Sequence, residues 1–207
     1  MQRNDQLKDK LITYLQDAEA MEHQIEEILE QQAKDAQPWP QIQQRIQQHL
    51  DATTTHRQRM EERLNAYNER PSTVKRAVAT MVGNMVGMTA GARTDALSKE
   101  ARDDYMIEHL EIAAYELLIT TASAYGDQET VAACEANLRD EVEMANWLEQ
   151  QLPHTAVLSF QQDGIPVPEA IAMSAEQDAL TSLQQARGAT GGMFQPSPDQ
   201  TSAQPMI

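Results

Sequence analysis

The distribution of proline limits what this chain can fold into. Only Pro38, Pro40 and Pro71 precede residue 153. Because proline disrupts the interior of a helix, these positions divide the chain into long segments in which a helix can run unbroken. Apolar residues recur every three or four positions in these segments, which is the period of an amphipathic helix. An aromatic content of only 4% also favours helix over sheet.

Four long helices follow from this pattern, and they are predicted over Asp5–Ala36, Pro40–Glu69, Lys99–Tyr125 and Gln128–Gln151. Residues 73–99 make a connection too long for a bare loop, and we expect a short helix over 74–88 within it. Two helical hairpins joined by one long crossover are the plan of ferritin-like four-helix bundles. The fold class is therefore predicted to be all-α, with the bundle spanning residues 1–152.

Beyond Pro153 the composition shifts to Pro, Gly, Gln, Ser and Thr. Residues 153–207 are expected to form a flexible tail, with an amphipathic stretch over 168–187 that can form a short helix. The segment 191–207 is predicted to be disordered and offers a docking peptide for an assembly partner.

The strongly acidic composition limits the classes of partner. The net charge of −16 argues against nucleic acid, because phosphate binding requires a basic face. No run approaches the ~18 apolar residues that span a membrane, and the N-terminus lacks the apolar segment of a signal peptide. Cys134 is the only cysteine, so no internal disulfide can form. These features together predict a cytoplasmic protein.

Four polar residues interrupt the apolar stripes, one near the middle of each long helix: Glu22, His56, Glu108 and Glu141. The sequence separation between Glu22 and His56 in the first hairpin is nearly the same as that between Glu108 and Glu141 in the second. This places all four residues at one level along the bundle. Burying an unpaired carboxylate costs several kcal/mol, so these residues are expected to share a positive charge. Carboxylates and imidazoles are ligands suited to iron or manganese, and Glu111, one turn after Glu108, offers another oxygen. The sequence predicts a metal site inside the bundle.

A metal-free interpretation stays open. In it, the polar residues pair with one another, for instance His56 with Glu22, and the bundle is a non-catalytic scaffold or dimerisation module. Tyr115 likewise has two interpretations. It packs as an ordinary core residue, or it is a redox-active or hydrogen-bonding neighbour of the site.

Several short motifs resemble those of the YciE/YciF-type ferritin-like proteins, the DUF892 family. The most specific is Glu-His-Leu-Glu-Ile-Ala-Ala-Tyr at 108–115. Others are Met-Glu-His-Gln-Ile at 21–25, His-Leu-Asp-Ala-Thr at 49–53 with His56, and Leu-Arg-Asp-Glu at 138–141. The resemblance implies a ferritin-like bundle, often dimeric, with a dinuclear metal site and a link to stress responses. Metal-assisted handling of oxygen or peroxide is the chemistry that such a site supports.

The chain departs from the ligand pattern of ferritin-like dinuclear sites, which use Glu-x-x-His on two helices. Thr53 stands three residues before His56, and Met144 three residues after Glu141, so one Glu and one His are missing. His49 and Asp51 are the nearby substitutes, although Asp51 lies off the best stripe. A dinuclear, a mononuclear and an empty site are all compatible with this pattern.

Overall fold

The long proline-free segments form helices, as their apolar period predicts. The computed structural model describes residues 2–75 and 96–190. Its helices are α1 (Gln2–Asp35), α2 (Pro40–Ala66), α4 (Ala96–Tyr125), α5 (Gln128–Gln162) and α6 (Glu169–Thr190). No strand occurs within this part of the chain, and the prediction of an all-α fold is confirmed. Beyond Lys75, the short helix predicted over 74–88 lies outside the described residues, as does the segment 191–207.

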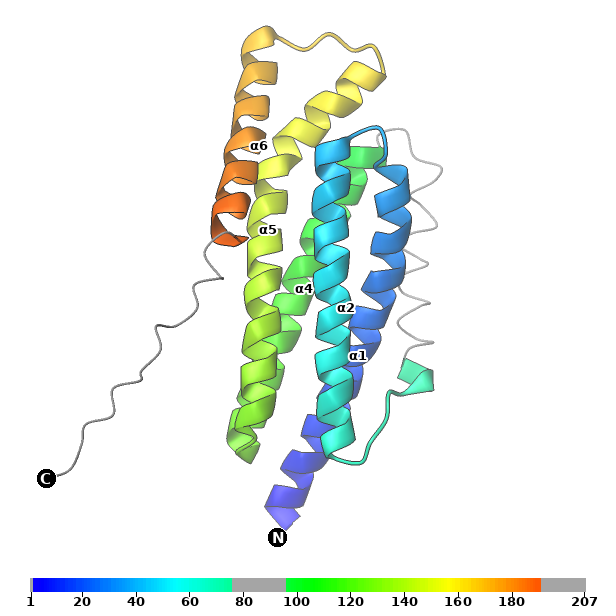
Figure 1. Cartoon of the computed structure of the whole chain (residues 1–207), viewed down its shortest axis with the longest axis vertical. Helices are drawn as coiled ribbons and strands as arrows, with labels where there is room; N and C mark the ends of the chain where they lie inside the picture. Colours follow the sequence, from blue (N-terminus) through cyan, green and yellow to red (C-terminus); the bar gives the residue numbers. More distant parts are fainter. Residues whose placement is uncertain (1, 76–95, 191–207) are drawn as a thin grey trace, which may run out of the picture.

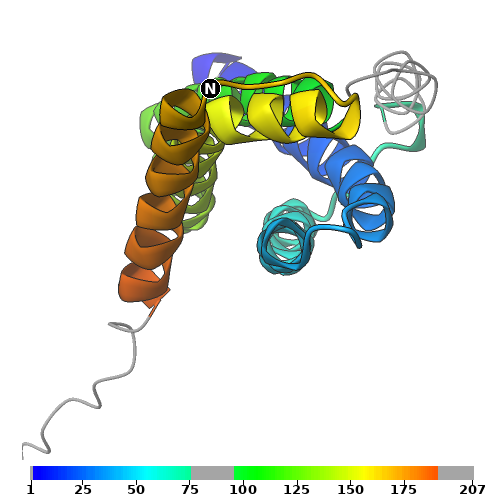
Figure 2. The same ribbon diagram turned by 90° about the horizontal axis from the view of Figure 1, so that it is seen from above.

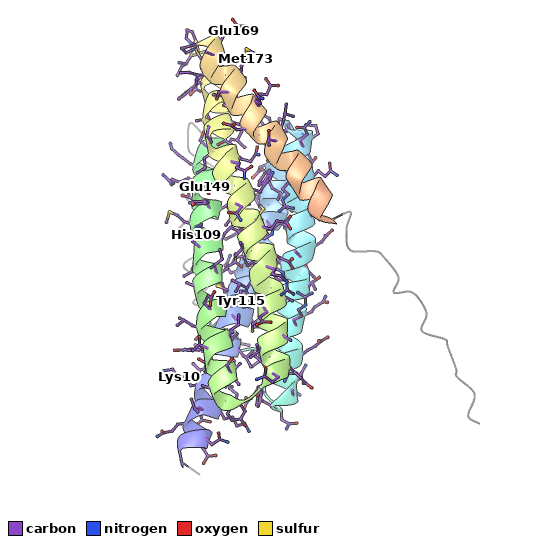
Figure 3. All side chains as sticks on the ribbon, turned by 90° about the vertical axis from the view of Figure 1, so that its left-hand side faces the viewer. Lys10, His109, Tyr115, Glu149, Glu169 and Met173 are labelled. Carbon is purple, nitrogen blue, oxygen red and sulfur yellow. The ribbon has the colours of Figure 1, made fainter. Side chains whose placement is uncertain are left out.

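Four of these helices form the bundle. α1 pairs with α2 and α4 with α5, and the two hairpins meet where α1 packs against α4 and α2 against α5 (Figure 1). This is the ferritin-like plan of two hairpins joined by a crossover. α6 lies outside the bundle, where it packs on α5 and crosses it obliquely (Figures 2 and 3).

The turn between α4 and α5 is held by Asp127. Gly126 before it adopts φ of 95°, a left-handed conformation that glycine tolerates without strain. The Asp127 carboxylate caps α5 by accepting a hydrogen bond from the backbone N–H of Thr130 at 3.0 Å. It also accepts hydrogen bonds from Arg63 and Tyr67. One carboxylate therefore ties the end of α2 to the α4–α5 turn.

The prediction that the fourth bundle helix stops at Gln151 is wrong. α5 continues to Gln162 with Pro153 inside it. Proline lacks the N–H that would bond the carbonyl of Glu149, one turn earlier. Glu149 is exposed, so water can satisfy that carbonyl, and Figure 1 shows α5 bending in this region. The helix predicted to end near Gly188 likewise continues to Thr190.

Two apolar clusters fill the bundle on either side of a polar layer. The cluster toward the α1–α2 turn includes Ile25, Leu29, Ile42, Ile46, Met144, Trp147 and Leu148. The cluster toward the α4–α5 turn includes Leu11, Leu15, Met60, Leu64, Tyr115, Leu118 and Cys134. Each bundle helix passes from one cluster to the other, and its polar residues fall between them. Among the described residues, no helix combines the length and the apolarity needed to cross a membrane.

Candidate metal centre

The polar layer contains two groups of buried residues that could hold a metal ion. All five residues predicted as ligands lie in them, and each is at most 2% exposed: Glu22, His56, Glu108, Glu111 and Glu141. The structure adds His49 of α2, which is 4% exposed. Asp51, the other substitute considered, is exposed and accepts a hydrogen bond from Gln47 instead. The structure thus brings the predicted residues together, while their role as metal ligands stays a prediction.

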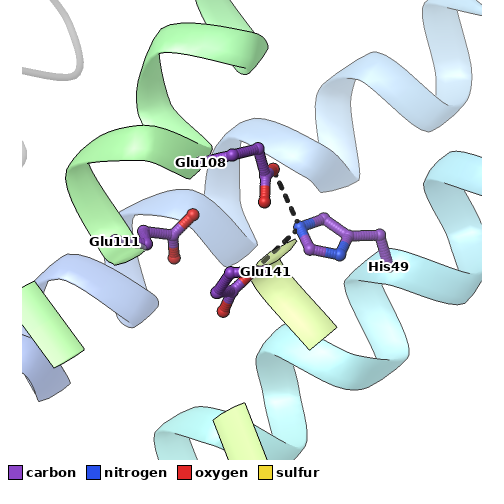
Figure 4. A group of neighbouring side chains, drawn as sticks. All are labelled: His49, Glu108, Glu111 and Glu141. Carbon is purple, nitrogen blue, oxygen red and sulfur yellow. Dashed lines mark ion pairs between the residues drawn. The ribbon is translucent and has the colours of Figure 1, made fainter. Parts of the chain in front are cut away.

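The first group consists of His49, Glu108, Glu111 and Glu141, called the His49 group (Figure 4). One ligand atom from each residue lies within 4.8 Å of the others. His49 Nε2 is 3.1 Å from an oxygen of Glu108 and 3.7 Å from Oε2 of Glu141. α2, α4 and α5 each contribute to this group, so its geometry depends on the packing of three helices.

The second group consists of Glu22, His56 and Glu141, called the His56 group. His56 Nδ1 lies 2.7 Å from Oε1 of Glu141 and 3.7 Å from Oε2 of Glu22. Glu141 therefore belongs to both groups, with Oε1 toward His56 and Oε2 toward His49. A carboxylate between two adjacent groups of ligands is the arrangement that suits a pair of ions.

Hydrogen bonds hold the residues of the His56 group from outside. His56 Nε2 is 3.0 Å from Oδ2 of Asp140, so the imidazole has carboxylates near both of its nitrogens. The Tyr115 hydroxyl donates to Glu22 and accepts from Nδ2 of Asn137 at 2.8 Å. Tyr115 is fully buried, so it both packs in the core and orients Glu22. The structure therefore combines two of the predicted roles of Tyr115, core packing and hydrogen bonding to the site.

Burial and crowding raise the pKa of two carboxyl groups in the layer, those of Glu22 and Glu111. Burial raises the pKa of Glu22 to about 8, despite the opposing effect of His56. Burial also raises the pKa of Glu111 well above its usual range, and the neighbouring Glu141 adds to the effect. Burial opposes protonation of His56, but hydrogen bonds with Asp140 and Glu141 outweigh it and raise its pKa to about 10. A cation that bound in the layer would therefore displace protons from these groups.

Thr53 and Met144 stand where the ligand pattern of ferritin-like dinuclear sites has a Glu and a His. Met144 is 1% exposed and belongs to the apolar cluster near the α1–α2 turn. Thr53 lies between His49 and His56 on α2 and is fully buried, and within the described residues its hydroxyl has no hydrogen-bond partner. His49, one turn before Thr53 on α2, is the residue that the structure places in the His49 group instead.

Residues 6–160 match the sequence family described as a domain of unknown function, DUF892. This chain belongs to the DUF892 family. The match spans the four bundle helices and therefore includes every residue of the two groups. The resemblance to this family predicted from the 108–115 motif is confirmed.

Solved structures with the same fold include three bacterial proteins. A protein of Xanthomonas campestris pv. campestris is 28% identical with a TM-score of 0.64, over 77% of this chain and 99% of that one. YcfI of Rhodopseudomonas palustris is 25% identical with a TM-score of 0.62, over 69% of this chain and 92% of that one. The E. coli stress protein YciF is 18% identical with a TM-score of 0.64, over 73% and 97% of the two chains. The DUF892 bundle of this chain is thus similar to these proteins over nearly their whole length.

Proposed function

We propose that this DUF892 protein binds one or two iron or manganese ions in the polar layer of its bundle, and that it acts in a stress response. The ligands would be His49, Glu108, Glu111 and Glu141 for one ion and Glu22, His56 and Glu141 for the other. Neutral imidazole and carboxylate oxygen are donors that suit both metals.

The observation that carries the proposal is the surroundings of Glu111. Its side chain is fully buried, and within the described residues neither of its oxygens has a hydrogen-bond partner. Leaving a buried carboxyl group without partners costs several kcal/mol. Figure 4 shows this carboxyl beside Glu108 and Glu141, with which it forms the His49 group. A cation in this group would supply the missing partner.

The charge balance of the layer supports the same conclusion. The two groups contain four carboxyl groups and two imidazoles. If all four carboxyl groups were ionised, two protonated imidazoles would still leave an excess of negative charge, and the raised pKa values of Glu22 and Glu111 reflect this crowding together with burial. A divalent cation offsets that excess where the carboxylates converge.

The protein's own residues would position the metal and hold its protons. Asp140 would fix His56 with Nδ1 toward the ion, and Tyr115 would orient Glu22 by its hydrogen bond. When bound, iron or manganese supplies redox chemistry with oxygen or peroxide and Lewis acidity. The apolar clusters above and below the layer keep bulk water away from it.

The biological part of the proposal comes from the relatives. The E. coli protein YciF is described as a stress protein. We extend that role to this chain, together with a cytoplasmic location and assembly as a homodimer. The shared fold supports the stress-response role, the family resemblance supports the homodimer, and the single cysteine supports the cytoplasmic location.

Metal analysis of the full chain, purified without a chelating tag, tests the proposal. We expect bound metal after equilibration with iron(II) or manganese(II), and a large loss of it in Glu111→Gln and Glu141→Gln. Glu116→Gln makes the same change at an exposed position of α4 and should bind as much metal as the parent. Equal metal content in Glu141→Gln and the parent would show that the groups are not the site.

A metal-free scaffold is the second candidate function, and one observation favours it. His56 is close to Glu141 and Asp140 at once, so protonated His56 can neutralise part of the layer without a cation. This candidate requires that added metal leave the thermal stability of the protein unchanged.

A further inference from the structure

We propose that two adjoining cavities beside α6 form a passage by which a small neutral oxidant reaches the His49 group. The oxidant class is that of dioxygen and hydrogen peroxide. This inference rests on the proposed metal function, for which it names a route and a size of substrate.

The inner cavity lies within the bundle and has a volume of about 40 Å³. Because a water molecule needs on the order of 10–15 Å³ of such space, the cavity has room for a molecule of only a few non-hydrogen atoms. Its walls are mainly apolar and include Ile42, Ile46, Leu97, Ala101 and Leu148. Asp35, Glu100 and Asp104 also line the cavity, so it is the apolar stretch of its wall that suits a small neutral molecule.

The base of this cavity lies next to the His49 group. Three lining residues are each one helical turn from a residue of that group, namely Ile46 from His49, Asp104 from Glu108 and Met144 from Glu141. One helical turn corresponds to a rise of about 5 Å. The half-buried Asp104 accepts a hydrogen bond from Gln32 at 2.7 Å, which places a polar pair where the apolar walls end.

An outer cavity of about 110 Å³ adjoins the inner one. The two share the lining residues Ile42, Trp147 and Gln151. The far wall of the outer cavity is formed by Glu176, Ala179 and Leu180 of α6. α6 therefore covers the outer end of the passage, which gives this helix a role beyond packing on α5.

Unpartnered polar atoms along the cavity wall suit peroxide in particular. Gln32 and Trp147 line the inner cavity, and each has a buried polar atom without a hydrogen-bond partner among the described residues. These atoms are an acceptor on Gln32 and a donor on Trp147. Hydrogen peroxide can form hydrogen bonds with both atoms, whereas dioxygen does not require either of them. The experiment therefore has to distinguish the two oxidants.

Tryptophan fluorescence reports on the passage without any metal. The chain has two tryptophans, Trp39 and Trp147, and both line the inner cavity. In a Trp39→Phe background, Trp147 is the sole reporter, and its quenching by dissolved dioxygen measures access to the cavity. Acrylamide, which is too large for the cavity, serves as the size control.

Two variants in this background change the cavity in opposite directions. Ala101→Phe fills it, and we expect dioxygen quenching of Trp147 to fall several-fold with acrylamide quenching unchanged. Leu97→Ala enlarges it and should raise dioxygen quenching. Ala113→Phe adds the same volume at an exposed position of α4 and should change neither.

The proposal is overturned if folded Ala101→Phe is quenched like Ala113→Phe. If Ala101→Phe does not fold, Leu97→Ala decides, and unchanged quenching in that variant overturns the proposal. Because this readout needs no metal, it stays valid even if the protein binds none, in which case only the proposed function fails.

Iron-loaded full chain then identifies the oxidant. Each oxidant takes one electron from each of two iron(II) ions; dioxygen with two protons gives hydrogen peroxide, and hydrogen peroxide with two protons gives two waters. We expect Ala101→Phe to slow iron(II) oxidation by at least one oxidant several-fold while iron affinity stays at the parental value. The oxidant that is slowed is the one that uses the passage, and unchanged rates with both would overturn it.

Discussion

At the scale of single residues, the two nitrogens of His56 have different neighbours. Nδ1 faces Glu141 inside the layer, whereas Nε2 faces Asp140, whose side chain is 44% exposed. A carboxylate on the far nitrogen fixes the tautomer and the orientation of a metal-binding imidazole. Asp140 therefore connects the candidate site to the surface without belonging to either ligand group.

Loss of Asp140 should weaken metal binding without abolishing it. Asp140→Ala is expected to lower the affinity for manganese(II) about 10- to 100-fold, because His56 loses its orienting partner. Isothermal titration calorimetry measures this directly. Glu135→Gln, at an exposed position of α5, is the matched control and should keep the parental affinity. An unchanged affinity in Asp140→Ala would mean that His56 is positioned by packing alone.

Tyr115 should contribute to stability through its hydroxyl. Tyr115→Phe removes the donor to Glu22 and leaves Asn137 Nδ2 without this acceptor. We expect the free energy of unfolding to fall by about 1–3 kcal/mol, measured in urea at equal slope for both proteins. Tyr14→Phe, near the surface of α1, should change it much less. A neutral Tyr115→Phe would assign this residue a packing role only.

Sequence patterns located the layer but not its full membership. Glu22, His56, Glu108 and Glu141 are detectable because each replaces an apolar residue in a stripe. His49 is harder to assign, since it lies at the end of a polar stretch where Thr53 also fits the stripe. Only the assembly of the two hairpins, with α1 packed against α4 and α2 against α5, decides that the imidazole of His49 reaches Glu108.

At the scale of elements, turn and cap residues join the helices into hairpins. Asp127 is the main example, because its carboxylate caps α5 and binds Arg63 of α2 and Tyr67, the residue directly after α2. The break predicted between a helix ending at Tyr125 and one beginning at Gln128 is confirmed, whereas the capping role of Asp127 was not predicted. Pro153 is the opposite case. Its effect depends on whether water reaches the freed carbonyl of Glu149, which the local sequence does not reveal.

The Asp127 carboxylate should make the protein sensitive to acid. Hydrogen bonds from Thr130 and Tyr67 and the charge of Arg63 outweigh burial and lower its pKa from 3.8 to about 2. A carboxylate with a lowered pKa in the folded state stabilises fully above the unfolded value. That contribution is therefore lost as pH falls from about 3.8 toward 2.

Two substitutions separate the charge of Asp127 from its cap. Asn caps helices well but carries no charge. Asp127→Asn should therefore lose the pH-dependent contribution to the free energy of unfolding and keep the contribution of the cap. Asp127→Ala should lose both, at a cost of about 1–2 kcal/mol at neutral pH from the cap alone. Unfolding measured at several pH values distinguishes them. Identical pH profiles for Asp127→Asn and the parent would exclude this carboxylate as a source of acid sensitivity.

At the scale of the whole molecule, the polar layer is enclosed between two apolar clusters. These clusters bury the stripes of all four bundle helices and do not depend on a cation. We therefore expect the metal-free protein to fold, in contrast to small domains that are unfolded without their metal. Metal should add to a stability that already exists.

Bound metal should raise the melting temperature. At a concentration about 100 times Kd, a ligand adds about 2.7 kcal/mol, which corresponds to roughly 5–10 °C for a domain of this size. Thermal unfolding with manganese(II) and with a chelator measures the difference. Glu111→Gln combined with Glu141→Gln should abolish it. If the parent melts at the same temperature in both conditions, the metal-free scaffold is the better description.

The position of Glu141 has a consequence for how ions would load. Since one of its oxygens faces each group, an ion in the first group changes the charge that the second group presents. Occupancy of the two positions is then linked, and the linkage is reciprocal, so each ion alters the affinity of the other by the same factor. Titration of the protein with metal would not follow two independent isotherms. The side chain of Glu141 would thus couple the His49 group and the His56 group, so that the two bind metal as one unit.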